Sequence, residues 1–132
     1  MAFETTTQVR FGHVDPAGTV FYPRYFEMLN GAVEDWFADM GRDFRSIIAE
    51  GRMGTPIVKL NAEFAAPSHL GDVLVIGFEV QRLGTASCEV SYAISCDGEQ
   101  RLRGSITMVC LDVSNKKAMP WPDDLRERMA KA

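Results

Sequence analysis

The feature of this sequence that most constrains its fold is a change in hydrophobic period after Gly54. Before this point apolar residues recur at about every 3.6 positions, as on one face of an α-helix, and after it they alternate with polar residues, as in a half-buried β-strand. The helical pattern runs from Phe21 to Met40, and Gly41 suits a helix end. A shorter helix is expected from Phe44 to Glu50. The pattern thus predicts one long amphipathic helix followed by strands.

The alternating part of the chain contains no helical pattern, so its strands follow one another directly. A β-branched segment before the long helix, Thr5 to Phe11, adds a further strand. Such strands form an antiparallel meander, and only the long helix is long and apolar enough to cover its apolar face. We therefore expect an α+β fold with an antiparallel sheet of about five strands wrapped around one central helix. The alternating segments are Val58 to Phe64, Leu74 to Val80, Cys88 to Cys96 and Leu102 to Cys110, with turns near Leu83-Gly84 and Asp97-Gly98.

Length and charge limit the partners of the chain. Its 132 residues, 46% of them hydrophobic, fit a single domain over residues 1–132, and a tail that begins with Pro and two acids predicts a short peripheral helix at 123–131. The formal charge of −4 gives no basic surface for nucleic acid. No apolar run approaches the roughly 20 residues of a membrane span, and the N-terminus lacks signal-peptide features. We expect a cytoplasmic protein with no nucleic-acid or membrane partner.

Several chemistries lack their required residues. Cys88, Cys96 and Cys110 are odd in number, have no CxxC spacing and fall at inward strand positions, so we expect reduced core thiols and neither a disulfide nor a metal site. The sequence has no GxSxG, HExxH, GxGxxG or GKS/T motif. Serine hydrolase, metallohydrolase and nucleotide-loop functions are therefore not expected.

The turn FGHVDPAGTVFYPRYFEM places one carboxylate, Asp15, just before the long helix. Helix N-termini carry unpaired N–H groups and the positive end of the macrodipole, so they favour negative charge nearby. The N–H groups from about Thr19 to Tyr22 are suited to bind the oxygen of a carbonyl under attack. Gly18 allows a substrate to approach the main chain closely. A carboxylate beside an oxyanion site is a minimal acyl-transfer centre.

A purely structural interpretation of the same residues stays open beside the catalytic one. An Asp before Pro often bonds its own backbone, and an Asp near a helix start is a common cap. His13 has no Ser or Cys beside it and is expected to be a hydrogen-bonding residue of the turn. His69 is expected to be a surface turn residue.

The segments HVDPAGTVFYPRYFEM, GTPIVKLNAEF and PSHLGDVL resemble the 4-hydroxybenzoyl-CoA thioesterase group of hotdog-fold acyl-CoA thioesterases, from about Thr5 to Val113. In that family the acid of the turn is the catalytic carboxylate, a nucleophile or general base. The backbone N–H at the tyrosine of the V-x-Y-P segment polarises the thioester carbonyl. By motif match these are Asp15 and Tyr22, with Val20 as the first residue of the segment. Thiolate leaves without strong acid assistance, so no cofactor is required.

The resemblance implies a thioesterase acting on an aromatic, benzoyl-type acyl-CoA. Tyr25 belongs to a group of rings at the helix start that is expected to line the acyl pocket. Some aromatic-substrate members carry a carboxylate further along the helix where this chain has Asn30, whose amide hydrogen-bonds a ring substituent without charge. The paired basic residues that meet the nucleotide phosphates near the second strand turn are missing. Possible substitutes are Arg82, Arg24 and Lys59.

Pro23 follows the tyrosine of the turn, where another branch of the family has His, and this favours the aroyl branch. Two alternatives remain open, a thioesterase for aliphatic acyl-CoA or acyl carrier protein, and a hotdog module that binds CoA esters without turnover. A five-stranded sheet has two open edges, so we expect a homodimer or homotetramer. The resemblance implies active sites between the chains.

Overall fold

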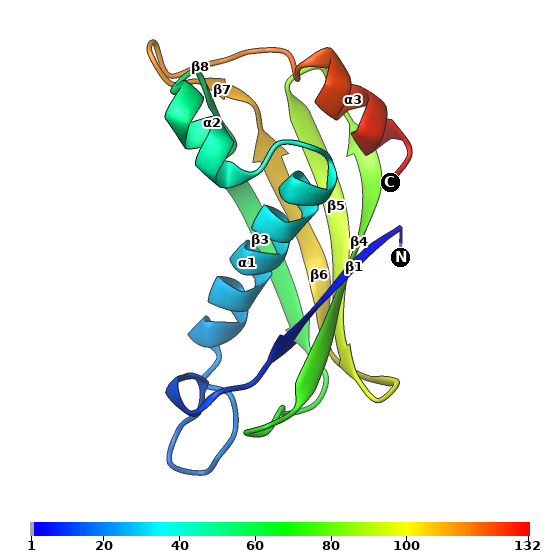
Figure 1. The fold of residues 1–132 in the computed structure, drawn as a ribbon. Coiled ribbons are helices and arrows are strands. Elements are labelled where there is room, and N and C mark those ends of the chain that lie inside the picture. The colour runs from blue at the N-terminus through cyan, green and yellow to red at the C-terminus, as the bar shows by residue number, and fades with distance from the viewer. Residues whose placement is uncertain (1) are drawn as a thin grey trace.

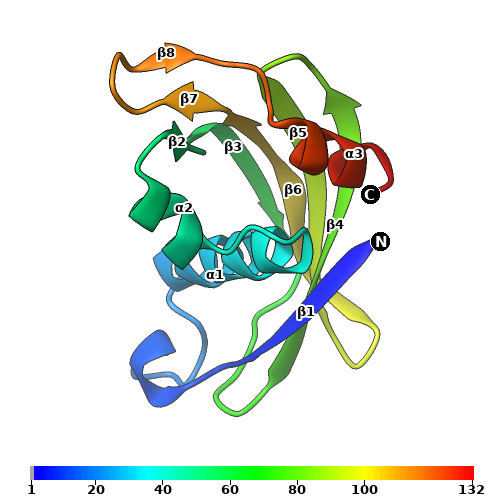
Figure 2. The ribbon, with the colours of Figure 1, turned by 45° about the horizontal axis from the view of Figure 1, so that its top comes forward.

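A sheet of five antiparallel strands curves around the long helix α1 (Figures 1 and 2). The computed structural model describes residues 2–132. In chain order the elements are β1 (Phe3–Gln8), the 3-10 turn η1 (Phe11–His13), α1 (Pro23–Asp39), α2 (Phe44–Glu50), β2 (Met53–Gly54), β3 (Ile57–Phe64), β4 (Val73–Leu83), β5 (Ser87–Cys96), β6 (Glu99–Val109), β7 (Leu111–Asp112), β8 (Lys117–Ala118) and α3 (Asp123–Ala130).

The strand order of the main sheet is β1-β4-β5-β6-β3, and each pair of neighbours is antiparallel. Asp97 and Gly98 both have positive φ in the turn between β5 and β6, as the predicted tight turn requires. The predicted α+β hotdog fold is confirmed. A second, three-stranded sheet of order β2-β7-β8 was not predicted, because strands of two residues leave no alternating pattern.

The core lies between α1 and the central strands, where helical and strand periods meet as predicted. The three cysteines are buried and free, in agreement with their predicted inward positions. On α1 the buried residues are Tyr25, Met28, Leu29, Ala32, Val33, Trp36 and Phe37. On β4, β5 and β6 they include Leu74, Ile76, Phe78, Cys88, Val90, Tyr92, Ile94, Cys96, Leu102, Ile106 and Met108.

The bounds of the first two predicted elements were wrong. β1 ends at Gln8 rather than Phe11, because pairing with β4 stops there and the chain turns into η1. The long helix begins at Pro23, with Tyr22 as its N-cap, so Phe21 lies outside it and is half-exposed. Proline at the first helical position fits this start, since the N–H it lacks has no intrahelical acceptor there.

The prediction that β3 buries one face was also wrong. Val58, Leu60 and Phe64 are 60%, 40% and 54% exposed. β3 is an edge strand that pairs only with β6, so nothing on its outer side covers these side chains in the single chain. Alternation marks an apolar face, but it does not say whether the same chain covers that face.

The prediction that the C-terminal helix is peripheral was wrong. Leu125 and Met129 of α3 are buried, and so is Trp121 just before it. Figure 2 shows α3 against the end of the sheet that α1 leaves uncovered. The Trp121 Nε1–H donates to the Ser87 carbonyl at 3.1 Å. A short charged helix thus closes one end of the core.

Candidate active site

The turn that contains Asp15 lies at the opposite end of the sheet, beside the connection between β3 and β4 (Figure 1). The Asp15 N–H donates to the Thr19 carbonyl, and the Gly18 N–H donates to the Asp15 carbonyl, each at 2.9 Å. The Asp15 Oδ1 accepts from the Ala17 N–H at 2.9 Å and from the Thr19 N–H at 3.3 Å. Asp15 therefore caps its own turn rather than α1, as the structural interpretation expected.

The two oxygens of the Asp15 carboxylate have different surroundings. Oδ1 is held by the two N–H groups of the turn and lies 3.3 Å from the Thr19 hydroxyl. Within residues 2–132, Oδ2 has a single and longer contact, 3.4 Å from the same hydroxyl. The structure thus holds one oxygen with two backbone N–H groups and leaves the other with a single long hydrogen bond to the Thr19 hydroxyl.

Of the N–H groups predicted to be free, only that of Tyr22 has no acceptor within the described residues. Buried backbone N–H groups are almost always hydrogen-bonded. Three of the four N–H groups from Thr19 to Tyr22 are used in this way to hold the turn. Thr19 donates to Asp15 Oδ1, Val20 to the Ser68 carbonyl and Phe21 to the His13 carbonyl.

The next donors along the chain are also committed. Arg24 and Tyr25 donate to the carbonyls of Phe21 and Tyr22, and Pro23 has no N–H. Among residues 19–25, Tyr22 is thus the one N–H donor without an acceptor in the described chain. An oxyanion site here would use this N–H.

A pocket of about 340 Å³ lies beside Tyr22, and we call it the ring pocket. The Phe64 ring lies 6.0 Å from that of Tyr25 and 6.4 Å from that of Tyr22, measured between centroids. Phe64 had been interpreted as a core residue of β3 and was missed as a site residue. The lining residues are Thr19, Val20, Tyr22, Tyr25, Phe64, Ala65, Ala66 and Pro67.

Asp15 itself lines a second pocket, of about 350 Å³, which we call the Phe11 pocket. The two pockets share no lining residue, and the turn from Asp15 to Thr19 contributes to both. The predicted site residues are therefore divided between the two pockets: Asp15 and Gly18 line the Phe11 pocket, and Val20, Tyr22 and Tyr25 line the ring pocket. The Phe11 pocket is lined by Phe11, Val14, Asp15, Pro16, Gly18 and Leu70.

Asn30 lines neither pocket. It is exposed on α1, and its Nδ2 donates to Glu34 Oε2 at 3.2 Å. It follows Phe26 by four residues on the same helix face, and the Phe26 ring lies 6.5 Å from that of Phe64. Asn30 thus lies on the side of α1 that faces the open edge strand β3.

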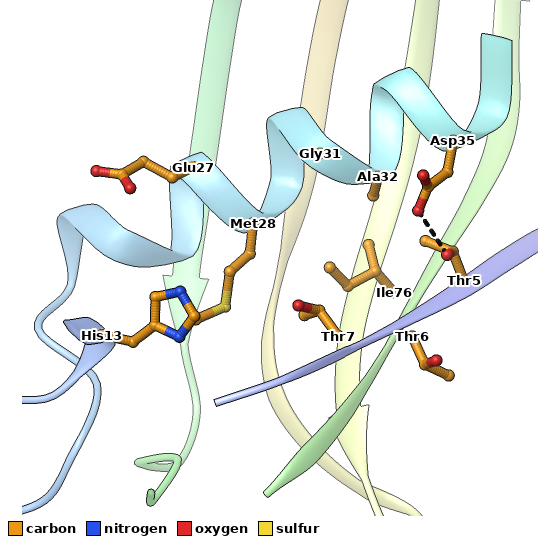
Figure 3. A pocket seen from close by; sticks show the side chains of 10 residues that line it. All are labelled: Thr5, Thr6, Thr7, His13, Glu27, Met28, Gly31, Ala32, Asp35 and Ile76. Atoms are coloured by element: carbon orange, nitrogen blue, oxygen red, sulfur yellow. Dashed lines mark hydrogen bonds between the residues drawn. The ribbon is translucent and has the colours of Figure 1, made fainter. Parts of the chain in front are cut away.

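A third pocket, between β1 and α1, contains none of the predicted site residues (Figure 3). His13 points into it, and its Nδ1 accepts the Arg10 N–H at 2.8 Å. Further along, the Thr5 hydroxyl donates to Asp35 Oδ2 at 2.7 Å. His13 therefore binds within its own turn, as predicted. His69 is an exposed residue of the β3–β4 connection, also as predicted.

The β3–β4 connection supports the turn, and sequence reasoning missed the residues that anchor it. Arg101 is 9% exposed, and its Nη1 donates to Asp72 Oδ2 at 2.7 Å and to the Pro67 carbonyl at 3.1 Å. The His69 N–H and the Arg101 guanidinium hold the pKa of Asp72 below its ordinary value. The connection in turn accepts the Val20 N–H at Ser68.

The three proposed phosphate-binding substitutes do not gather near Asp15. Arg24 is paired with Glu27 at 2.6 Å. Arg82 lies near the end of β4 remote from the turn, and Lys59 lies near the corresponding end of β3 (Figure 1). Within residues 2–132, no helix is long and apolar enough to cross a membrane, and no group of three His, Cys, Asp or Glu residues could hold a metal ion.

Comparison with known proteins agrees with this architecture. Residues 9–129 match the family model described as the thioesterase-like superfamily. The chain is 29% identical over 118 residues to a 1,4-dihydroxy-2-naphthoyl-CoA hydrolase of Thermosynechococcus vestitus, covering 89% of this chain and 81% of the relative. It is 39% identical over 80 residues to a 4-hydroxybenzoyl-CoA thioesterase of Pseudomonas sp., covering 58% and 57%. The crystal structure of a 1,4-dihydroxy-2-naphthoyl-CoA thioesterase from Synechocystis superposes with a TM-score of 0.88 at 25% identity, covering 97% and 95%.

Proposed function

The chain belongs to the thioesterase-like superfamily, and we propose that it hydrolyses aromatic, benzoyl-type acyl-CoA thioesters to the free acid and CoA. It is a thioester hydrolase, since its relatives are named for the hydrolysis of CoA thioesters. The relatives named above act on naphthoyl and benzoyl groups. These names support an aromatic acyl group for this chain as well.

The observation that carries the proposal is the unused N–H of Tyr22 at the ring pocket, with the Asp15 carboxylate in the same turn. In the proposed reaction this N–H donates to the thioester oxygen as charge develops on it. Asp15 Oδ2 either attacks the carbonyl carbon to form an anhydride that water then hydrolyses, or removes a proton from a water that attacks the carbonyl carbon directly. In both cases the carbon–sulfur bond breaks and CoA leaves as the thiolate.

The ring pocket supports a flat acyl group. Tyr22, Tyr25 and Phe64 offer ring faces and edges for stacking, and Val20 adds an aliphatic wall. We assign the acyl group to this pocket. Asn30 reaches a ring substituent only if a second chain completes the site on the β3 side, because in the single chain its amide bonds Glu34.

The test is kcat/KM for benzoyl-, 4-hydroxybenzoyl-, phenylacetyl- and hexanoyl-CoA, measured by thiol release. We expect the aromatic esters to be preferred, with a 4-hydroxyl advantage of no more than about tenfold, since one neutral hydrogen bond contributes up to ~1.5 kcal/mol. A parallel series with Asn30→Asp should raise that advantage if Asn30 meets the ring substituent. Faster hydrolysis of hexanoyl-CoA than of every aromatic ester would favour the aliphatic alternative. Tight binding of all four esters without thiol release would favour a non-catalytic module.

A further inference from the structure

Phe11 is an aromatic side chain that the fold of the chain does not use. It begins the turn η1 and is 83% exposed, so it makes almost no packing contacts. Leu70, from the β3–β4 connection, is 50% exposed and lines the same pocket as Phe11 and Asp15. Single exposed apolar residues are common, but these two flank the only carboxylate of a pocket that is otherwise apolar.

A backbone hydrogen bond joins two walls of the Phe11 pocket, and a glycine leaves part of its backbone bare. The Leu70 N–H donates to the Gly18 carbonyl at 3.0 Å, which joins the two walls. Gly18 has φ of 81°, and a Cβ at this position would meet nothing within 4 Å. A ligand can therefore approach the main chain here between the Phe11 and Leu70 side chains.

A thioester substrate needs two binding pockets, because its acyl chain and its thiol-derived arm extend from the carbonyl carbon in different directions. The Asp15 turn lines both pockets, since Thr19 belongs to the ring pocket and Asp15, Pro16 and Gly18 belong to the Phe11 pocket. We propose that the Phe11 pocket holds the pantetheine arm of CoA, with Phe11 and Leu70 against its aliphatic part, while the acyl group occupies the ring pocket. This assignment rests on the proposed function, which supplies the CoA thioester.

A positive charge lies next to the Phe11 pocket, as expected if the phosphate end of CoA extends from it. Arg10 immediately precedes Phe11, is exposed, and takes part in none of the ion pairs formed within residues 2–132. In a chain with a net charge of −4, an unpaired guanidinium beside an apolar pocket suits a ligand with an apolar arm and terminal phosphates.

The test separates the two ends of the substrate. Phe11→Ala, Leu70→Ala and Arg10→Gln are assayed with benzoyl-CoA and with the benzoyl thioester of N-acetylcysteamine, which lacks most of the arm and all phosphates. We expect Phe11→Ala to lower kcat/KM for benzoyl-CoA about tenfold, as for loss of a large apolar contact, and to leave the truncated ester within about twofold. Ile48→Ala and Arg45→Gln on α2 are the matched controls, since Ile48 is 75% exposed and both lie outside the pockets.

Two results would overturn the assignment. If Phe11→Ala and Leu70→Ala lowered kcat/KM equally for the CoA ester and the truncated ester, and the loss depended on the acyl group, the acyl group would occupy the Phe11 pocket. Unchanged kinetics in Phe11→Ala and Leu70→Ala would remove the pocket from the substrate path. Calorimetric binding of CoA itself gives a readout without turnover, so weaker CoA binding by Phe11→Ala would support the subsite even if the wild-type chain hydrolysed no ester and the proposed function failed.

Discussion

At Asp15, the difference between the two carboxylate oxygens decides what a substitution will do. Asparagine has the same shape and keeps one oxygen that can accept from the Ala17 and Thr19 N–H groups, as Oδ1 does now. It replaces Oδ2 by an amide nitrogen, which can neither attack a carbonyl nor accept a proton from water. We therefore predict that Asp15→Asn lowers kcat by ~100-fold or more while the melting temperature and CoA-ester binding stay close to those of the wild type. Near-normal turnover would remove Asp15 as the reacting group.

The two histidines provide the internal comparison for that experiment. His13 accepts the Arg10 N–H within η1, and His69 is exposed on the β3–β4 connection. Neither lines a pocket together with Asp15 or Tyr22. His13→Ala and His69→Ala should each cost far less activity than Asp15→Asn. A loss at either histidine as large as that at Asp15 would show that the base had been misassigned.

Among the elements, the β3–β4 connection holds the Asp15 turn in place, and an ion pair anchors this connection. Asp72 accepts from the His69 N–H and from Arg101, and its pKa is lowered below the ordinary 3.8. A lowered folded-state pKa means that this stabilisation is fully present above pH 3.8 and is lost as the pH falls through the lower folded value. We predict that Asp72→Asn lowers the free energy of unfolding at pH 7 by roughly 2 kcal/mol, the scale of a hydrogen bond to a charged group.

Melting temperatures measured at acidic pH check this prediction. The difference in melting temperature between wild type and Asp72→Asn should be constant from pH 7 to about 4 and should shrink as the solution is acidified below that. Asp39→Asn, an exposed change on α1, is the control and should leave the curve unchanged. A difference that persisted undiminished at pH 2 would mean that Asp72 acts through shape rather than charge.

The elements also show what the sequence could and could not predict. Period and turn chemistry located α1, α2 and the strands β4 to β6, because each buries a face within the chain. They also located β3 and α3, but the predicted burial of both elements was wrong. Val58, Leu60 and Phe64 follow an apolar alternation whose cover lies outside the chain, whereas Leu125 and Met129 are two apolar residues in a charged segment and leave little pattern.

At the candidate site the same limit applies to hydrogen bonds. The motif located the turn and its acid, but which N–H groups remain free depends on Ser68 and His13, whose carbonyls take the donors of Val20 and Phe21. Those partners are set by the packing of the β3–β4 connection against the turn. Hence four free donors were predicted, and the structure leaves that of Tyr22.

For the whole molecule, the uncovered edge of the sheet is the feature with the largest consequence. The outer side of β3 has no partner strand within residues 2–132, although its face carries the apolar residues that a core would need. Unpaired strand edges with exposed apolar side chains favour pairing with another chain. Phe64 joins this edge to the ring pocket, and Asn30 lies on the same side of α1. A second copy paired along β3 would therefore also border the proposed acyl pocket.

We predict a homodimer or homotetramer in which β3 strands of two copies pair, so that the site is complete only in the assembly. The substitutions Val58→Glu and Leu60→Glu together place two charges on this edge at positions already exposed in the single chain, so the fold of each chain should survive. Light scattering should then report a monomer with native circular dichroism and little thioesterase activity, whereas Ile48→Glu, at an exposed position on α2, should change neither mass nor activity. A fully active monomer would contradict a site shared between chains. An unchanged mass in the double variant would instead place the interface elsewhere. Burying two unpaired carboxylates would cost more free energy than pairing along β3 contributes.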